Sequence, residues 1–205
     1  MAIGDSITEG FGDSVPGLEC RSWADWVADA LLAIEPTLEY RNIGLRGTTT
    51  ADVLLDQLSA VLVARPELVS ITIGGNDARL PAWTPEQFER EFTELLSGVA
   101  STGAQLVTFA YPDIRPGIKA AGVEVRDSWA LYFERLTVVD AVIRDVSQRF
   151  GTCLLDFEHF EAASSPENLS ADYTHPNARG YRLAAEVALG RLTECFDLSE
   201  LQLQS

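Results

Sequence analysis

The chain has 205 residues, of which 46% are apolar, and this is enough for one domain over residues 1–205 with a sizeable core. Acidic residues outnumber basic ones 31 to 15, and the resulting net charge of -16 argues against nucleic acid or anionic lipid as a partner. No apolar stretch approaches the roughly 18 residues of a membrane span, and no signal-peptide pattern opens the chain. We therefore expect a cytoplasmic protein without a membrane span, or a secreted one if a leader peptide has been removed.

Apolar blocks alternate between strand-like and helix-like character, which predicts an α/β domain with a parallel sheet. The predicted strands are short runs rich in branched residues: Met1–Ile3, Leu38–Ile43, Leu68–Ile73, Gln105–Ala110 and Thr152–Asp156. The predicted helices have helical spacing of apolar residues: Ser22–Ile34, Ala51–Ala64, Pro85–Ser101, Ser128–Phe150 and Ala178–Leu192. Tyr111–Asp127 contains two prolines and two glycines and is predicted to be a loop that either shapes a pocket or is a surface excursion.

The cysteines form no metal or redox pattern, because Cys20, Cys153 and Cys195 lie far apart in the sequence. We expect them to be small buried apolar side chains. Another local signal is Asn177, which is expected to cap the N-terminus of the last helix.

Ligands of an open parallel sheet bind beyond the carboxyl ends of the strands. The corresponding loops carry glycines or reactive side chains: Gly4-Asp5-Ser6, Gly44-Leu45-Arg46-Gly47, Gly74-Gly75-Asn76-Asp77 and Asp172-Tyr173-Thr174-His175. Ser6 is placed at a turn that begins a short helix, where the helix N-terminus favours developing negative charge. A simple capping role for Asp5 and Ser6 is the alternative that this short segment leaves open.

A serine hydroxyl needs a base to become a nucleophile, and histidine suits that task near neutral pH. The chain has two histidines, and both follow an aspartate by three positions, as Asp156–His159 and Asp172–His175. Pro176 disfavours helical geometry at His175 and so holds it on a loop, where Asp172 can orient one ring nitrogen while the other meets a serine. His159 lies among acidic residues and is expected to be a structural or surface histidine, so we favour His175.

Acyl transfer also needs hydrogen-bond donors for the oxygen that becomes negative in the tetrahedral intermediate. The candidates are the backbone of Gly47, the side-chain amide of Asn76 and the N–H of Ser6. Each also has a structural explanation, namely tight-turn geometry for the glycine and an Asx-turn for the asparagine.

Together these four loops resemble the blocks of the SGNH hydrolases, also called the GDSL esterase and lipase family. The family name lists the serine, glycine, asparagine and histidine that correspond to Ser6, Gly47, Asn76 and His175. The resemblance implies a flavodoxin-like three-layer α/β/α fold with about five parallel strands in the order 2-1-3-4-5. It also implies an ester hydrolase that needs no metal or organic cofactor.

The roles that this resemblance implies are Ser6 as nucleophile, His175 as base, Asp172 as orienting acid, and Ser6, Gly47 and Asn76 as oxyanion donors. Gly44 then has a turn role. The sequence departs from the family in having an isoleucine after the serine, and in a first strand so short that we expect weakened core packing.

The substrate is expected to be a small-molecule or glycan ester, and Arg79 and Trp83 are candidate substrate-binding residues. Arg79 has the alternative of a surface salt bridge. A thioesterase or acyltransferase on the same site, and a non-catalytic module that binds acyl groups or glycans, are the rival functions. No sequence pattern indicates an oligomeric state.

Overall fold

The computed structural model describes residues 1–125 and 127–196. Its parallel sheet has the strand order β1-β2-β3-β4, with β1 at Ala2–Gly4, β2 at Leu68–Thr72, β3 at Gln105–Ala110 and β4 at Cys153–Asp156. The register places Ile3 beside Ile71, Ile71 beside Thr108, and Thr108 beside Leu154. Because the strands are parallel, the loops that follow them all lie at one edge of the sheet.

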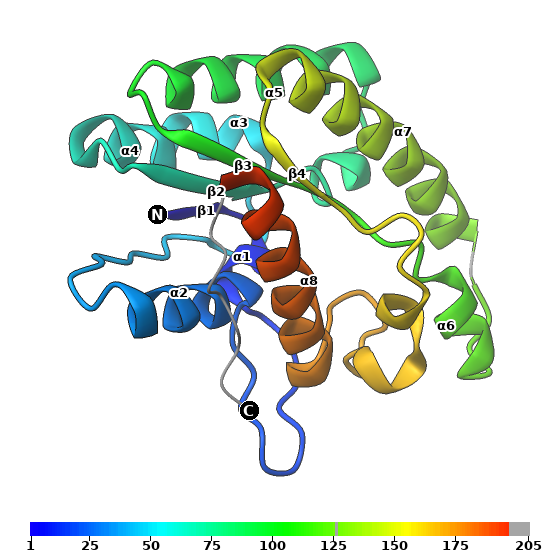
Figure 1. Cartoon of the computed structure of the whole chain (residues 1–205). Coiled ribbons are helices and arrows are strands. Elements are labelled where there is room, and N and C mark those ends of the chain that lie inside the picture. Colours follow the sequence, from blue (N-terminus) through cyan, green and yellow to red (C-terminus); the bar gives the residue numbers. More distant parts are fainter. Residues whose placement is uncertain (126, 197–205) are drawn as a thin grey trace.

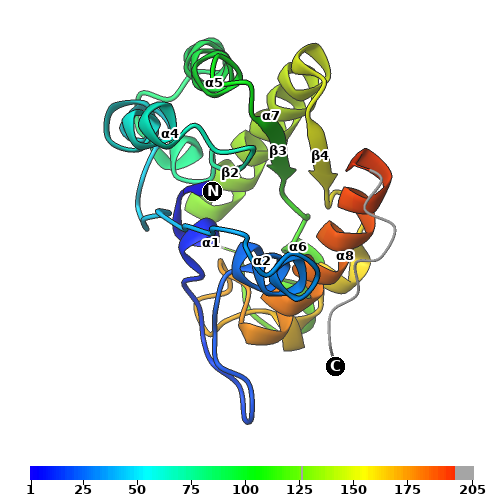
Figure 2. The same cartoon turned by 60° about the vertical axis from the view of Figure 1, so that its left-hand side comes forward.

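Helices cover both faces of this sheet, so the expected three-layer α/β/α arrangement is confirmed (Figure 1). One face carries α3 (Thr50–Asp52), α4 (Leu58–Ala64), α5 (Pro85–Ala100) and α7 (Asp127–Phe150), and the other carries α2 (Trp23–Ile34) and α8 (Ala178–Phe196). The view in Figure 2 shows α2 and α8 side by side across the sheet from α4 and α5. Helix α5 illustrates why the sequence folds this way, because Phe88, Phe92, Leu95, Leu96 and Val99 form one buried stripe.

The remaining elements are short. They are α1 (Ser6–Glu9), α6 (Arg115–Ala120), a π-helix η1 (Val53–Gln57) inside the predicted helix Ala51–Ala64, and the 3₁₀ turns η2 (Asp77–Arg79), η3 (Glu161–Ser164) and η4 (Pro166–Asn168). As expected, Asn177 caps α8, since its Oδ1 accepts hydrogen bonds from the N–H groups of Arg179 and Gly180. Among the residues that the structure describes, no helix has both the length and the apolar composition of a membrane span.

The prediction of a strand at Leu38–Ile43 is wrong, so the sheet has four strands rather than five. This segment makes only one parallel bridge, between Asn42 and Ala2. The N–H of Ala2 donates to the Arg41 carbonyl and the N–H of Ile43 donates to the Ala2 carbonyl. The pairing does not extend because the N–H of Gly4, the next β1 residue on this side, donates to Gln57 Oε1 at 2.8 Å instead of to this segment.

The short β1 is nevertheless well packed, contrary to our expectation for the core. Ala2 and Ile3 are fully buried, and β1 has hydrogen-bonded neighbours on both sides.

Two corrections concern other segments. The predicted loop Tyr111–Asp127 contains helix α6 (Arg115–Ala120), which tolerates Pro116 because a proline in the first helical turn removes no helical hydrogen bond.

The second correction concerns the cysteines. Cys153 at the start of β4 and Cys195 near the end of α8 form a disulfide, with their Cα atoms 5.9 Å apart. Only Cys20 is a free thiol among the described residues. A separation of 42 residues in the sequence could not show this pairing, because it arises from packing α8 beside β4.

Candidate active site

The turn from β1 into α1 holds Ser6 rigidly. The Oδ1 atom of Asp5 accepts a hydrogen bond from the N–H of Ile7 at 3.0 Å and so caps α1. Gly4 has a φ of +134°, and a Cβ atom there would lie 2.0 Å from the carbonyl oxygen of Thr72. Glycine is therefore required at this position, where the backbone of the turn before Ser6 lies against β2.

Gln57, which our sequence analysis missed, holds Gly4 from the other side. Its Oε1 accepts from the Gly4 N–H at 2.8 Å, and its Nε2 donates to the Gly4 carbonyl at 2.9 Å. Gln57 is the last residue of the π-helix η1 and is buried. A uniform helical pattern does not reveal such a bulge, although the position of Gln57 at helical spacing between the apolar Val53 and Val61 was the available signal.

Ser6, His175 and Asp172 form a hydrogen-bonded chain. Ser6 Oγ lies 2.9 Å from His175 Nε2, and His175 Nδ1 lies 2.6 Å from Asp172 Oδ2. The backbone N–H of His175 also donates to Asp172 Oδ1 at 3.0 Å. The edge of the Phe11 ring packs on the imidazole at a centroid distance of 4.9 Å. These contacts orient the imidazole so that Nε2 faces the serine and Nδ1 faces the carboxylate.

The same contacts set the charge state of Asp172. Partial burial raises the pKa of this carboxyl, but hydrogen bonds from the side chain and backbone of His175 and from the Thr174 backbone outweigh burial and lower the pKa to about 2. Asp172 is therefore ionised throughout the neutral range and can hold a proton on the facing nitrogen of His175.

Gly47 and Asn76 both lie on the cavity wall that contains Ser6. Gly47 has a φ of +79°, and its N–H has no backbone partner within residues 1–125 and 127–196. The Asn76 side-chain amide donates one hydrogen bond to the Thr48 carbonyl at 2.9 Å, which leaves its second N–H available.

Two buried carboxyl groups behind the serine tie the loops together. The hydroxyl of Tyr111 donates to Asp5 Oδ2 at 3.2 Å and accepts from the Gly75 N–H at 3.3 Å. Both oxygens of Asp77 accept from the N–H of Thr50 at 3.1 Å. Burial raises the pKa of Asp5 to about 7 and that of Asp77 to about 6.

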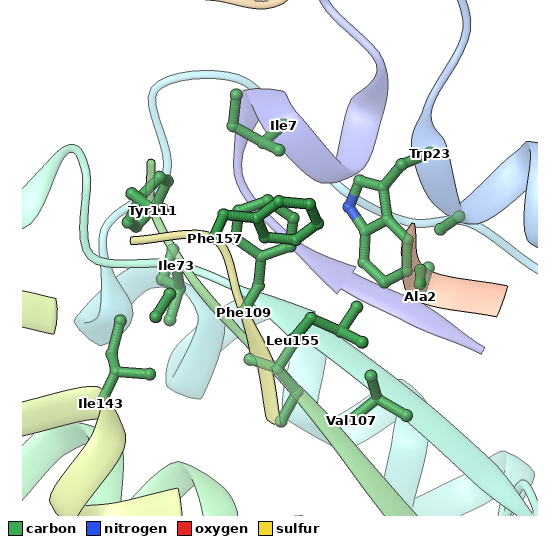
Figure 3. Packing of buried hydrophobic residues seen from close by; sticks show 14 of the residues in the cluster. Ala2, Ile7, Trp23, Ile73, Val107, Phe109, Tyr111, Ile143, Leu155 and Phe157 are labelled. Carbon is green, nitrogen blue, oxygen red and sulfur yellow. The ribbon is translucent and has the colours of Figure 1, made fainter. Parts of the chain in front are cut away.

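A cavity of about 420 Å³ opens beside Ser6 and His175. The side chains that make its apolar wall are Ile7, Phe109, Ile114, Leu136, Phe157 and Leu169. In Figure 3 the stacked rings of Phe109 and Phe157 lie below Ile7, and their centroids are 4.6 Å apart. Tyr111, Pro112 and Ile114 also line the cavity, so the segment after β3 shapes a pocket rather than forming a surface excursion.

The remaining predicted residues lie in different places. Arg79 lines the cavity, whereas Trp83 does not and instead packs under the guanidinium of Arg135 at 5.5 Å. The side chain of His159 is 92% exposed, and its nearest acidic group is Glu158 at 3.7 Å, so it is a surface histidine. No group of three or more His, Cys, Asp or Glu side chains in the described part of the chain is arranged to hold a metal ion.

Comparison with known proteins identifies the family. The sequence model of the GDSL-like lipase/acylhydrolase family matches residues 2–183. A solved structure of LAE5, an alpha/beta hydrolase enzyme from the metagenome of Lake Arreo in Spain, is 27% identical with a TM-score of 0.71, over 95% of this chain and 94% of LAE5.

Two further structures share the fold. The lipase/acylhydrolase from Enterococcus faecalis has 23% identity and a TM-score of 0.69, over 100% of this chain and 97% of its own. The acetylxylan esterase Axe2 from Geobacillus stearothermophilus has 21% identity and a TM-score of 0.69, over 93% and 92%. No curated protein sequence matches this chain. The family match covers most of the chain, and the chain therefore belongs to the GDSL-like lipase/acylhydrolase family of carboxylic ester hydrolases.

Proposed function

We propose that this protein hydrolyses carboxylic esters through an acyl-serine intermediate, with Ser6 as nucleophile, His175 as general base and Asp172 as orienting acid. The observation that carries the proposal is the chain of two hydrogen bonds, 2.9 Å from Ser6 Oγ to His175 Nε2 and 2.6 Å from His175 Nδ1 to Asp172 Oδ2. These distances are within the range that general-base catalysis requires.

In the first step, the Ser6 proton moves to His175 Nε2 while Ser6 Oγ forms a bond to the ester carbonyl carbon. The tetrahedral intermediate collapses, the bond to the alkoxy oxygen breaks, and His175 returns the proton to the departing alcohol. In the second step, water attacks the acyl-serine and gives its proton to the same nitrogen. His175 then protonates Ser6 Oγ, and the carboxylic acid leaves.

The negative oxygen of each tetrahedral intermediate would be stabilised by the N–H groups of Ser6 and Gly47 and by the side-chain amide of Asn76. The support for this assignment is that these groups line one cavity, that the Gly47 N–H has no backbone partner in the described part of the chain, and that Asn76 keeps one N–H available. Donors held in place before the reaction contribute more than donors that must reorient.

The apolar wall of the cavity, with Phe109 and Phe157, suits the hydrocarbon part of a small ester. A glycan ester is the substrate class that the name of the acetylxylan esterase suggests for that protein. The proposed reaction is the same for either class, since the acyl group is transferred to Ser6 in both.

The test is the purified Ser6→Ala variant, assayed on chromogenic short-chain esters. Without the nucleophile, kcat/KM should fall by about 10³-fold or more. A fluorophosphonate probe should add once to the wild-type protein at Ser6 and not to the variant. Ser97→Ala on α5 is a matched control, because the Ser97 hydroxyl is exposed and only donates to the Thr93 carbonyl. A Ser6→Ala variant with the wild-type rate would refute the proposed function.

A further inference from the structure

Two arginines line the cavity, and their charge environments differ. Arg46 is neutralised, since its Nη2 donates to Glu9 Oε1 at 2.5 Å and its Nε contacts both Glu9 oxygens at 3.0 Å. Arg79 has no carboxylate within 4 Å among the side chains that the structure describes. The surface salt bridge that the sequence analysis gave as the alternative role of Arg79 is therefore not present among these side chains.

The turn that carries Arg79 is held in place by a second arginine. Arg135 Nη1 donates to the carbonyl oxygens on both sides of Arg79, at 3.2 Å to Ala78 and 2.7 Å to Leu80. Arg135 itself lies over the ring of Trp83. This arrangement gives Trp83 an indirect role in the site, because it supports the residue that clamps the Arg79 turn.

The guanidinium of Arg79 is placed by an aromatic ring instead of an acid. It lies 4.1 Å above the centroid of Tyr132, whose side chain also lines the cavity. Such a cation–π contact restrains the exposed Arg79 side chain but does not neutralise its charge, and the guanidinium keeps N–H groups that can donate to a ligand. The site is thus preorganised for a further partner.

Nearby carboxyl groups do not provide that partner. Asp172 is engaged by His175, and Asp5 is buried behind Ser6 against Ile7 and Tyr111. The chain as a whole has about twice as many acidic as basic residues. Asp77, two residues before Arg79 on η2, is buried and accepts from the Thr50 N–H instead. An arginine on the cavity wall with no carboxylate within 4 Å provides a local positive charge that attracts an anion to this position.

From these contacts we infer that Arg79 binds a carboxylate or phosphate group carried by the ester, so that the preferred substrates are anionic esters. The inference rests on the proposed function and adds a substrate class to it. The fork of guanidinium N–H groups matches the oxygens of either anion. Arg79 follows Asn76 by three residues on the turn η2, and the anion would therefore bind on the Asn76 side of Ser6.

Three pairs of esters, each with one neutral and one anionic member, test this inference. The first compares 4-nitrophenyl hexanoate with the mono-4-nitrophenyl ester of adipic acid, which has a carboxylate at the end of an equally long acyl chain. The second compares methyl 4-acetoxybenzoate with 4-acetoxybenzoate, which places the carboxylate on the alcohol side. The third uses 4-acetoxyphenyl phosphate against phenyl acetate, and so separates phosphate from carboxylate.

For at least one anionic ester, we expect wild-type kcat/KM to exceed that of its neutral counterpart. Arg79→Gln should lower this value about 10- to 100-fold, mainly through KM, because a charge-assisted hydrogen bond is lost. The neutral ester should lose much less, so that the ratio of anionic to neutral kcat/KM falls in the variant, and 0.5 M NaCl should weaken the wild-type preference. Arg79→Lys should retain part of the preference, since it keeps the charge without the fork.

Arg90→Gln is the matched control, because Arg90 is exposed on α5, outside the cavity, and its loss changes the net charge equally. The inference is overturned if wild-type enzyme prefers the neutral ester in all three comparisons, or if Arg79→Gln slows neutral and anionic esters alike. Either result leaves the proposed function standing, provided that hydrolysis still depends on Ser6. Failure of the proposed function is distinct, since then no ester would be cleaved in a Ser6-dependent way.

Discussion

Two segments of this protein have the same spacing of aspartate and histidine, yet only one of them reaches Ser6. In the first, the His175 side chain is 18% exposed and lies 2.6 Å from Asp172. In the second, the His159 side chain is 92% exposed, and Asp156 instead accepts hydrogen bonds from Arg144 at 2.7 and 2.9 Å. The same spacing in the sequence therefore does not by itself bring a histidine ring onto its aspartate.

The residue that follows each aspartate explains the difference. Phe157 is buried against Phe109, which anchors the chain after β4 and leaves His159 on the surface. Tyr173 instead adopts a left-handed conformation with a φ of +52°, which is uncommon for a bulky residue. This turn brings the backbone N–H and the ring of His175 back to the Asp172 carboxylate. The packing of Phe157 in one segment and the left-handed turn at Tyr173 in the other thus decide which histidine lies on its aspartate.

The largest expected effect is a contrast between the two histidines. His175→Ala should lower kcat/KM for a neutral ester by about 10⁴-fold, because the proposed base is removed. His159→Ala should change it by less than about twofold, since a surface substitution of this kind has little effect. Both variants should have the same circular dichroism spectrum as the wild type. Similar losses of kcat/KM in both variants would contradict the different roles of the two histidines.

The next contrast concerns the two aspartates. Asp172→Asn should lower kcat by about 10³-fold, because the amide no longer holds His175 in the reactive tautomer. Asp156→Asn should leave kcat unchanged and cost about 0.5 kcal/mol of unfolding free energy, since its ion pair with Arg144 is partly solvent-exposed. Steady-state kinetics and urea unfolding measure the two effects separately.

A smaller effect is expected from the turn itself. Tyr173→Val should lower kcat about 10-fold or more, because a β-branched residue is disfavoured at positive φ and shifts the turn. Tyr173→Asn should keep most of the activity, since asparagine tolerates this conformation better. If the valine and asparagine variants have equal kcat, the left-handed turn does not place His175.

The smallest effect is a pH dependence of stability. The folded-state pKa of Asp172 is lowered to about 2, so its contribution is fully present above the unfolded value of about 3.9 and is lost as pH falls through 2. The free energy of unfolding of wild-type enzyme should therefore exceed that of Asp172→Asn above pH ~4 and converge with it near pH ~2. Because Asp172 is partly exposed, solvent screening limits this difference to about 1 kcal/mol. Urea unfolding at several pH values measures it, and a difference that grows towards low pH contradicts it.

The sequence by itself determined the parts of this protein that depend on local pattern. Buried strands and amphipathic helices appear as apolar periodicity, and the capping of α8 by Asn177 follows from its position before the helix. The four loops with Ser6, Gly47, Asn76 and His175 could be placed at one edge because parallel strands end together. Loop context, with Pro176 directly after His175, also favoured His175 over His159, whereas the spacing from the aspartate is the same for both histidines.

Only the tertiary structure decided the features that depend on contacts between distant segments. Gln57 meets Gly4 across 53 residues and Tyr111 meets Asp5 across 106, while Cys153 and Cys195 become neighbours only when α8 packs beside β4. The predicted strand at residues 38–43 is reduced to a bridge because the Gly4 N–H of its partner β1 donates to Gln57, a contact that the sequence of the segment does not show. Likewise, the uncompensated charge of Arg79 depends on which side chains surround it. Local periodicity carries no information about such partners, because they are chosen by how the helices and loops pack.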